Sequence, residues 1–575
     1  MAVFFNGQLL ISPVTASVVN DDAMRNQNLT VGNNVAIVGS SDGGAPKSAL
    51  SFGSPQEAVR TLVAGELLDA VLAAFNPSNE TNGPSKVIAV RVNPAVQSTL
   101  DLKDSTAATC ITLTSTGYGL GENLVRVKIE AGSTTGLRPT VQKGNDYYTA
   151  DNLTRNAFSI RYSGAQASAV ATINGTSVVL QAPTGTTVAT IDLNQYKTVR
   201  DVVDRINLVA GFAAVVLDGN YSAPALNGLD YITAQDVKTA TVTVKGDLQA
   251  VVDWFNSAQQ DFVTAVRTAG VGKPPAVVAF QFLAGGSNGV TTNTDWSDAF
   301  GVLQNVDVQW VTPVSSDGAI HAMTDAHCSY MSNVARKERR AIVGMGLSTT
   351  DTAAIALAKS LNSDRTSVVH IGHYNYDTTG VLRLFPAYIS AAMLSGAFAG
   401  VSPGTPLTNK SIKVQGLERN LRNPLDTDPL INGGVLCLEN TSNGYKVVKS
   451  ISTWLVNDNY NRVEQSCGVA LDFVMRNVRE ALDVLRGAKG NALVLSRAAS
   501  ITQSTLKKLS VDEPQGPGVL AGNKDSPAFR NIKVELEGDV LSVVFECSPV
   551  IPVNYVLVTV FAVPFNGTAT AALGG

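Results

Sequence analysis

The alternation of strand-like and helix-like segments is the feature that most constrains how this chain folds. Residues 339–373 show it best: a β-branched run at 341–343 leads into a Gly-Met-Gly turn, an apolar-periodic segment follows, and a second β-branched run occupies 368–371. A helix between two such strands must cross back over the sheet, so the strands run parallel. The same alternation occurs over residues 35–93 and again from 274 onward. It predicts an α/β core, a mainly parallel sheet with flanking helices.

Other parts of the chain have different patterns. Residues 100–270 consist of short alternating strands with turn residues and one or two helices, which is typical of a β-rich domain inserted between core strands. After residue 405, an irregular Pro- and Asn-marked segment leads to a hairpin around Asn443-Gly444 and a long amphipathic helix over 462–486. The predicted division is an N-terminal arm (1–20), a discontinuous core (21–99 and 271–405), a β-rich insertion (100–270), an α+β C-terminal domain (406–550) and a C-terminal arm (551–575).

Composition excludes several classes of protein. A formal charge of −4 with 16% charged residues provides no basic surface for nucleic acid. The N-terminus has no basic region before its apolar residues, so we expect no secretory signal. The apolar segment 384–401 contains Pro386, Gly396 and two serines, and we expect a buried helix rather than a membrane span. The five cysteines are far apart and predict neither a zinc site nor a disulfide framework.

The Gly344–Gly346 turn has the appearance of a dinucleotide-binding loop, but the required pattern is incomplete. Thr349 stands where the third glycine of G-x-G-x-x-G belongs, and the next strand ends without a carboxylate for a ribose. Thr349, Thr350 and Asp351 are instead typical of the start of a helix. We therefore expect no cofactor at this turn.

The remaining catalytic patterns also fail. Ser41 lies in a G-x-S-x-G sequence, but Gly-Ala-Pro follows it where a nucleophile elbow needs a helix. His321, Asp325 and Cys328 would share one helix face, yet no fourth metal ligand is evident. We predict no catalytic residues, no cofactor and no metal site, and hence no enzyme.

Both ends of the chain carry apolar strand-like segments, 3–11 and 553–565. A terminal strand either closes the sheet of its own molecule or pairs with a neighbouring molecule, and the pattern alone leaves both open. In the helix at 462–486, several charged residues lie off the apolar stripe, as on a solvated face or a docking face. The candidate contact residues are Phe4, Phe5, Leu9, Leu10, Ile11, Tyr555, Val556, Leu557, Val558, Val560, Phe561, Arg476, Arg479 and Arg486.

Several motifs, in this order, resemble those of one family. They are "FFNGQLLISPVTASVV", "GNNVAIVGSSDGG", "GPSKVIAVRVN", "GYGLGENLVRVKIEAG", "FLAGGSNG", "AAMLSGAFAGVSPGTPLTNKSI" and "NGGVLCLENTSNGYKVVKSIST". Together they resemble the contractile tail sheath proteins of bacteriophages and the related sheaths of phage-tail-like injection systems. The sequence departs from the family at "TPLTN", where the family usually has Pro-Ala-Asn, and in the length of its insertion.

The resemblance implies a structural subunit that polymerises as stacked rings around an inner tail tube and contracts by rigid-body rearrangement. It implies that residues 1–20 and 551–575 are arms exchanged between subunits, that the insertion faces outward, and that Arg476, Arg479 and Arg486 face the tube. The implied partners are the subunit itself, the inner tail tube protein, and the baseplate and tail terminator proteins, with no direct contact to nucleic acid or membrane. The implied location is the virion, after assembly in the host bacterial cytoplasm. Alternatives are a capsid or fibre protein and, less expected, an α/β hydrolase or nucleotide-binding enzyme.

Overall fold

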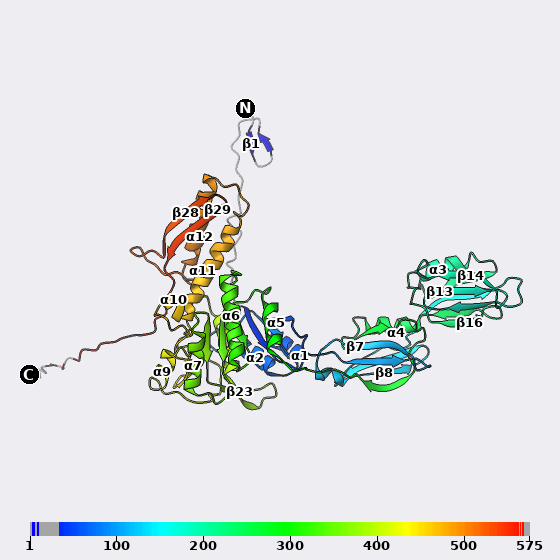
Figure 1. The fold of residues 1–575 in the computed structure, drawn as a ribbon, viewed down its shortest axis with the longest axis horizontal. Helices are drawn as coiled ribbons and strands as arrows, with labels where there is room; N and C mark the ends of the chain where they lie inside the picture. The colour runs from blue at the N-terminus through cyan, green and yellow to red at the C-terminus, as the bar shows by residue number, and fades with distance from the viewer. Residues whose placement is uncertain (1–2, 6–7, 11–33, 563, 565, 568–575) are drawn as a thin grey trace, which may run out of the picture.

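The computed structural model describes residues 3–5, 8–10, 34–562, 564 and 566–567. Figure 1 shows an α/β core, with a helical C-terminal region standing on one side of it and a β-rich insertion extending away from another. The C-terminal segment leaves the body near the junction of the core and the helical region. The chain is therefore elongated, with the core at the branching point.

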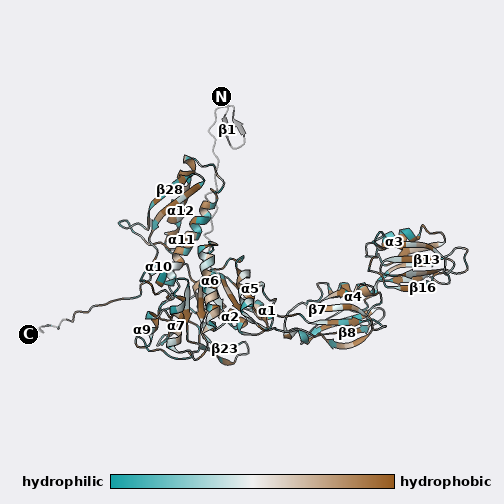
Figure 2. Cartoon of the chain, viewed as in Figure 1, coloured by the Kyte–Doolittle hydropathy of each residue, from teal (hydrophilic) through white to brown (hydrophobic). Residues whose placement is uncertain are grey.

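A six-stranded sheet forms the centre of the core, in the order β22-β21-β20-β3-β5-β4. All neighbouring strands pair parallel except β4, which runs antiparallel to β5. The strands are β3 (Asn34–Gly39), β4 (Ala49–Phe52), β5 (Lys86–Arg91), β20 (Trp310–Pro313), β21 (Arg340–Gly344) and β22 (Thr366–Val369). Nearly continuous burial along five of them fits a sheet covered on both faces, and the hydrophobic strands are brown in Figure 2.

Helices cover both faces of this sheet. α2 (Glu66–Phe75) and α8 (Ala387–Gly400) pack on the face that carries Val35 and Ile37, and Trp310 of the sheet stacks on Phe398 of α8 at 4.4 Å between ring centroids. α5 (Asn293–Leu303) and α6 (Gly318–Asn333) pack on the opposite face. The other core helices are α1 (Pro55–Leu62) and α7 (Asp351–Leu361).

The segment predicted as a buried helix at 384–401 forms α8, and residues 387–399 of it are all buried. A sheet face on one side and α2 on the other leave no solvated side, which explains why the segment is apolar all round. Within the described ranges, no helix has both the length and the apolar character needed to cross a membrane.

The insertion consists of two modules, one nested inside the other. The proximal module contains the sheets β18-β7-β6 and β10-β9-β8-β19, and α4 shares their hydrophobic cluster. Its elements are β6 (Thr99–Lys103), β7 (Thr109–Ser115), η1 (Leu120–Leu124), β8 (Val125–Ala131), β9 (Leu137–Lys143), β10 (Asp146–Thr149), α4 (Asp247–Phe255), β18 (Val263–Arg267) and β19 (Val278–Phe282).

The distal module, residues 156–245, has a separate hydrophobic core between the sheets β15-β11-β17 and β14-β13-β12-β16. It lies farthest from the α/β core in Figure 1. Its elements are β11 (Asn156–Tyr162), β12 (Val170–Ile173), β13 (Ser177–Gln181), β14 (Thr187–Asp192), α3 (Val199–Ile206), β15 (Phe212–Val216), β16 (Ile232–Asp236) and β17 (Val242–Lys245).

One strand was predicted in the wrong sheet. The run at 274–286 was expected to open the second part of the core, but its strand β19 pairs antiparallel with β8 of the proximal module. Its position at the sheet edge leaves Phe282 55% exposed, so its apolar residues do not mark a buried core strand. The chain returns to the α/β core only with α5.

Residues 373–447 pack mainly against the α/β core. Leu417, Leu430, Leu438 and Val447 belong to the hydrophobic cluster that also contains the core sheet. The elements are β23 (His373–Tyr376), β24 (Leu382–Phe385), β25 (Gly416–Leu417), α9 (Thr427–Asn432), β26 (Leu438–Thr441) and β27 (Gly444–Val447). The hairpin predicted around Asn443-Gly444 is confirmed by the pairing of β26 with β27.

The helical C-terminal region contains two long helices and a β-hairpin. The helix predicted over 462–486 is interrupted at Glu464, which separates α10 (Tyr460–Val463) from α11 (Gln465–Asp483). α12 (Ala492–Leu509) and the hairpin β28 (Phe529–Glu537) and β29 (Val540–Cys547) complete the region around one hydrophobic cluster.

Candidate assembly interfaces

The N-terminal segment forms a small hairpin. β1 (Val3–Phe5) pairs antiparallel with β2 (Gln8–Leu10), with Phe4 opposite Leu9. The sheet has two strands among the described residues, so one edge of each strand is not paired within this sheet. Ile11, also predicted as a contact residue, lies outside the described residues.

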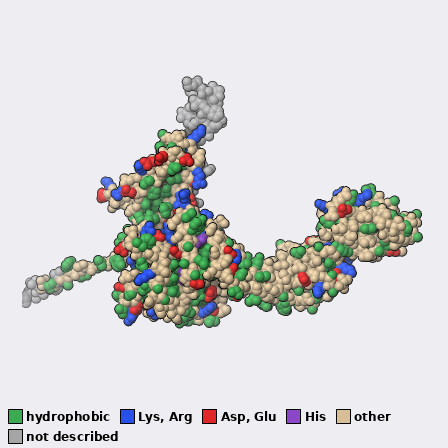
Figure 3. Space-filling model, viewed as in Figure 1, with side chains coloured by type: hydrophobic (Ala, Val, Ile, Leu, Met, Phe, Trp, Pro, Cys, Tyr) green, Lys and Arg blue, Asp and Glu red, His purple; other side chains and the backbone are tan. Residues whose placement is uncertain are grey.

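The C-terminal segment is extended and carries a continuous run of exposed apolar side chains. Tyr555 is 77% exposed, Leu557 93% and Phe561 86%, and Val556, Val558 and Val560 are similarly open. Figure 3 shows the green hydrophobic side chains along this segment. It forms no strand with other described residues, although its sequence alternates as a strand does. Such a run is unfavourable in water and is typical of a surface that contacts a partner.

The hairpin of β28 and β29 is a second exposed edge. Phe529, Ile532 and Phe545 pack on the cluster formed with α11 and α12, while Val540 and Val544 are 58% and 60% exposed. Because this sheet has only two described strands, each has one edge outside the pairing, and such an edge can accept a further strand. This hairpin was not predicted from the sequence, although its period-two alternation around Gly538 is a signal for it.

Two of the three arginines predicted to face a partner point back into the chain. Arg476 is 8% exposed and donates to the carbonyl of Glu338, and Arg479 pairs with the carboxylate of Glu338. Only Arg486 is open, with its side chain 84% exposed and 2.6 Å from Asp483. The amphipathic pattern did not reveal these contacts, because the partner Glu338 of Arg476 and Arg479 lies just before the core strand β21.

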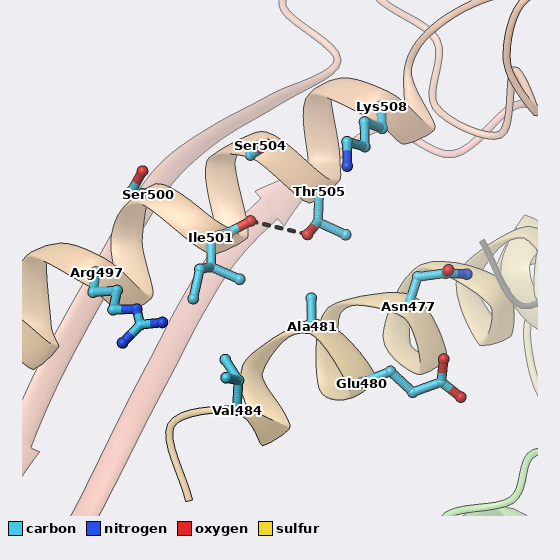
Figure 4. Close-up of a pocket in the computed structure, with 10 residues that line it drawn as sticks. All are labelled: Asn477, Glu480, Ala481, Val484, Arg497, Ser500, Ile501, Ser504, Thr505 and Lys508. Atoms are coloured by element: carbon cyan, nitrogen blue, oxygen red, sulfur yellow. Dashed lines mark hydrogen bonds between the residues drawn. The ribbon is translucent and has the colours of Figure 1, made fainter. Parts of the chain in front are cut away.

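A groove of about 600 Å³ lies between α11 and α12. Figure 4 shows Ala481 of α11 and Ile501 of α12 facing each other across it. Its wall is mixed in character and is formed by Asn477, Glu480, Ala481, Val484, Arg497, Ser500, Ile501, Ser504, Thr505 and Lys508.

We call the junction between α11 and the core the shoulder, and define it by Arg340, Arg365, Gln465 and Asp472. One carboxylate oxygen of Asp472 accepts from Arg340 Nε at 2.8 Å and from Arg365 at 2.6 Å, and Gln465 accepts from Arg340 at 2.8 Å. The Arg340 side chain is 4% exposed. A Cβ at Gly468 would stand 2.1 Å from this guanidinium, so the glycine lets α11 lie directly on it.

We call the junction between core and insertion the neck, and define it by Arg91, Asn93, Asn123 and Asn288. Asn123 accepts from the Gly286 N–H and from Ser98 Oγ, and donates to the Gly286 carbonyl, which ties the two ends of the insertion together. These contacts join the motif that contains Asn123 to the glycine-rich turn that contains Gly286.

Arg91 is fully buried at the neck and is bonded only to neutral oxygens. Its guanidinium donates to the side-chain oxygens of Asn93 and Asn288 and to the carbonyls of Gly44 and Tyr118. Burial lowers its pKa to about 10, which still leaves it charged at neutral pH.

The Gly344–Gly346 turn is occupied by the chain itself. A Cβ at Gly344 would stand 2.2 Å from the carbonyl oxygen of Ala387, so this glycine permits the close approach of α8. Thr350 caps α7 by accepting from the Ala353 N–H, as predicted. The Glu418 carboxylate accepts from the N–H groups of Ser348 and Gly372, the kind of donors that a phosphate would need.

The other residues tested for chemistry have structural partners. The Ser41 hydroxyl donates to the Gly43 carbonyl at 2.8 Å within its loop. His321 contacts the Ser315 carbonyl, and Asp325 accepts from Thr366, so these two side chains do not converge with Cys328. Over the ranges that the structure describes, no group of His, Cys, Asp and Glu is placed to hold a metal ion.

The chain is similar to known proteins along almost its whole length. It is 29% identical to the tail sheath protein of Bacillus phage SP01, over 99% of this chain and 98% of that protein. It is 27% identical to the putative tail sheath protein of Enterococcus phage phiEF24C, over 95% and 96% of the two chains. No protein-family profile matches the sequence.

Among solved structures, the sheath tail protein of Listeria innocua aligns with a TM-score of 0.54 at 12% identity, over 90% of this chain and 92% of that one. This likeness shows a shared fold. The curated relatives are tail sheath proteins, which confirms the resemblance predicted from the motifs. They are structural proteins, and the prediction that the chain is not an enzyme is confirmed with them.

Proposed function

Because this chain is a homologue of phage tail sheath proteins, we propose that it is the structural subunit of a contractile tail sheath. The observation that carries the proposal is the similarity to the relative from phage SP01 across essentially the full length of both chains. The subunits polymerise as a helical stack of rings around an inner tail tube. Contraction of this lattice drives the tube through the host envelope and so delivers the genome.

The termini serve as exchange arms in this proposal. The exposed apolar run at 555–561 and the N-terminal hairpin each supply a strand, and the β28–β29 hairpin of a neighbouring subunit offers edges that accept one. Main-chain hydrogen bonds formed in this way connect subunits strongly but leave their relative orientation free to change. The alternating sequence of 553–561 supports this role, since it becomes a regular strand as soon as a partner edge is present.

Contraction is a rigid-body rearrangement of subunits from an extended lattice to a compact one. The extended lattice persists because the barrier to rearrangement is high, which is a kinetic form of stability. The buried ion pairs of the shoulder support this proposal, because they hold the helical region and the core together as one body.

Arg486 is the residue that we propose to face the inner tube, since it alone of the three predicted arginines is open. The other proposed partners are the baseplate and the tail terminator proteins at the two ends of the sheath. The protein is then a component of the virion, assembled in the cytoplasm of the host bacterium. An R486E variant should bind less inner tube protein in co-sedimentation, while R530E, also exposed and paired, should bind normally.

Deletion of residues 1–12 tests the arms. The shortened protein should keep the circular dichroism spectrum and melting temperature of the full chain, yet form no sheaths in negative-stain electron microscopy. V215S, a substitution of a 62% exposed residue in the distal module, is the control and should form normal tubes. Normal tubes from the deletion variant would refute arm exchange. Closed shells or spikes from the full chain would favour a capsid or fibre protein instead.

A further inference from the structure

The place where the C-terminal segment leaves the body is built from specific contacts. The Val550 N–H donates to the Val519 carbonyl, and its side chain packs on the cluster around α11 and α12. Pro552 and Asn554 are half-buried, whereas the alternating residues Ile551 and Val553 are exposed. From Tyr555 onward, all side chains that the structure describes are exposed. The segment therefore packs one of its faces against the body as far as Asn554 and then extends away from it.

Asn554 is held by a buried carboxylate. Its Nδ2 donates to Glu464 Oε1 at 2.7 Å, and Lys449 Nζ lies 3.7 Å from the same oxygen. Glu464 is 1% exposed and occupies the break between α10 and α11, where its backbone also bridges to Ile451. The acceptor is thus fixed by two helices and a bridge.

The contact is poorly suited to a purely stabilising role. Glu464 Oε2 and Asn554 Oδ1 are both buried and have no hydrogen-bond partner. A buried acceptor without a partner is unfavourable, and two apolar side chains of similar shape would stabilise the same place better. What the polar pair provides instead is a directional bond at the last point of contact before the exposed run.

We propose that Glu464 and Asn554 form an anchor that fixes where and in which direction the C-terminal arm leaves the subunit. They are positioning residues for the strand at 555–561. This inference rests on the proposed exchange of that arm and adds the element that aims it. With Asn554 held, the middle of the strand lies about 4 residues from the last fixed point; without it, that distance becomes about 8 residues, counted from Val550.

The anchor should raise the local concentration of the arm at a neighbouring subunit. Effective concentration falls roughly as the −3/2 power of linker length, so doubling the free length lowers it about 3-fold. N554A should therefore raise the protein concentration needed for sheath formation about 3-fold. N554D should raise it further, because it places a second carboxylate against Glu464.

Two variants serve as controls. E464Q keeps an oxygen that can accept from Asn554 and should assemble as the native protein does. V553A changes an 81% exposed neighbour of Asn554 and should also behave as native. Sedimentation of sheaths over a range of protein concentrations measures the effect.

A measurement on the unassembled subunit separates positioning from stability. Nitroxide labels at L557C and Q503C, in a C547S background that leaves four buried thiols, report the arm-to-body distance by double electron–electron resonance. N554A should broaden the distance distribution at least 2-fold without changing the melting temperature. An unchanged distribution, or an unchanged concentration for assembly, would overturn the anchor.

Deletion of residues 555–575 distinguishes this inference from the proposed function. If the truncated protein still forms sheaths, exchange of the C-terminal arm is wrong whatever the anchor does. If truncation abolishes sheaths but N554A assembles as the native protein does, the arm exchanges and the anchor is refuted.

Discussion

The neck and the shoulder join different parts to the same core in opposite ways. At the neck, a single buried cation, Arg91, is bonded to neutral oxygens, and Asn123 ties the two ends of the insertion through amide bonds. At the shoulder, Asp472 pairs with Arg340, the first residue of β21, and with Arg365, just before β22. Removing a neutral amide takes no charge away from the site. Removing one partner of a buried ion pair leaves the other charge buried and unpaired, which is strongly unfavourable. The shoulder is therefore the junction where one substitution matters most.

Asp472→Ala should have the largest effect. It leaves Arg340 and Arg365 without their shared carboxylate in a buried site, and we expect a loss of about 3–5 kcal/mol in the free energy of unfolding. Urea denaturation followed by tryptophan fluorescence measures it. Asp472→Asn keeps the shape and one acceptor and should lose less; equal losses for the two variants would mean that the charge is unimportant.

Asn123→Ala should have the next largest effect. It removes three hydrogen bonds at the neck, each worth about 1 kcal/mol, so we expect a loss of about 2–3 kcal/mol. Faster proteolysis of the residues linking core and insertion should accompany it. Asn194→Ala, which removes an exposed local bond to Asp192, is the matched control. A loss larger than that of Asp472→Ala would reverse the comparison.

Acid should weaken the core before the insertion. All four histidines lie in the core, and burial lowers the pKa of His327 and of His373 to about 4. They are neutral in the fold but charged when unfolded below about pH 6.5, so stability is lost as pH falls from 6.5 toward 4, by about 2 kcal/mol for each at pH 5.

Two buried carboxylates respond in the opposite sense. Burial raises the pKa of Asp230, in the distal module, and of Asp69, in the core, to about 6. Each binds a proton more readily in the fold, so the fold gains about 1 kcal/mol between pH 7 and pH 5. The histidines outweigh Asp69 in the core. The protection factors against hydrogen exchange should therefore fall in β21 but not in β13 between pH 7 and pH 5; an equal fall in both would contradict the assignment.

Arg486→Ala should have the smallest effect. Its ion pair with Asp483 is exposed on both sides, so we expect a loss below about 0.5 kcal/mol, measured by the same urea titration. A loss comparable to that of Asp472→Ala would show that the exposed ion pair contributes as much stability as the buried ones, contrary to this comparison.

The sequence predicted the core best because its strands are buried on both faces and so appear as uninterrupted β-branched runs. β3, β5, β21 and β22 lie where such runs occur, and α7 begins at the predicted Thr350 cap. The run at 274–286 misled because an edge strand can carry equally apolar residues. Local pattern reports the character of a segment and not the sheet to which it pairs.

The interfaces were harder to predict. Arg476 and Arg479 are off the apolar stripe of their helix. Their partner Glu338 lies about 140 residues earlier, and no pattern near the arginines indicates this contact. The anchor at Asn554 depends likewise on Glu464, which is 90 residues away. The terminal segments were recognisable because they are apolar and alternate, but the edges of β28 and β29, which we propose as their partners, were not predicted.

The nesting of the distal module has a consequence for how proteins of this architecture change in evolution. The module begins at Asn156 and ends at Lys245, residues that face each other across β11 and β17, and the flanking Gly246 N–H donates to the Arg155 carbonyl at 2.9 Å. The two points of attachment are thus already neighbours in the proximal module. A short turn could close that gap, and a different domain with adjacent ends could be accommodated there. The outermost part of the molecule is therefore free to diverge, recombine or disappear while the rest of the subunit keeps its shape.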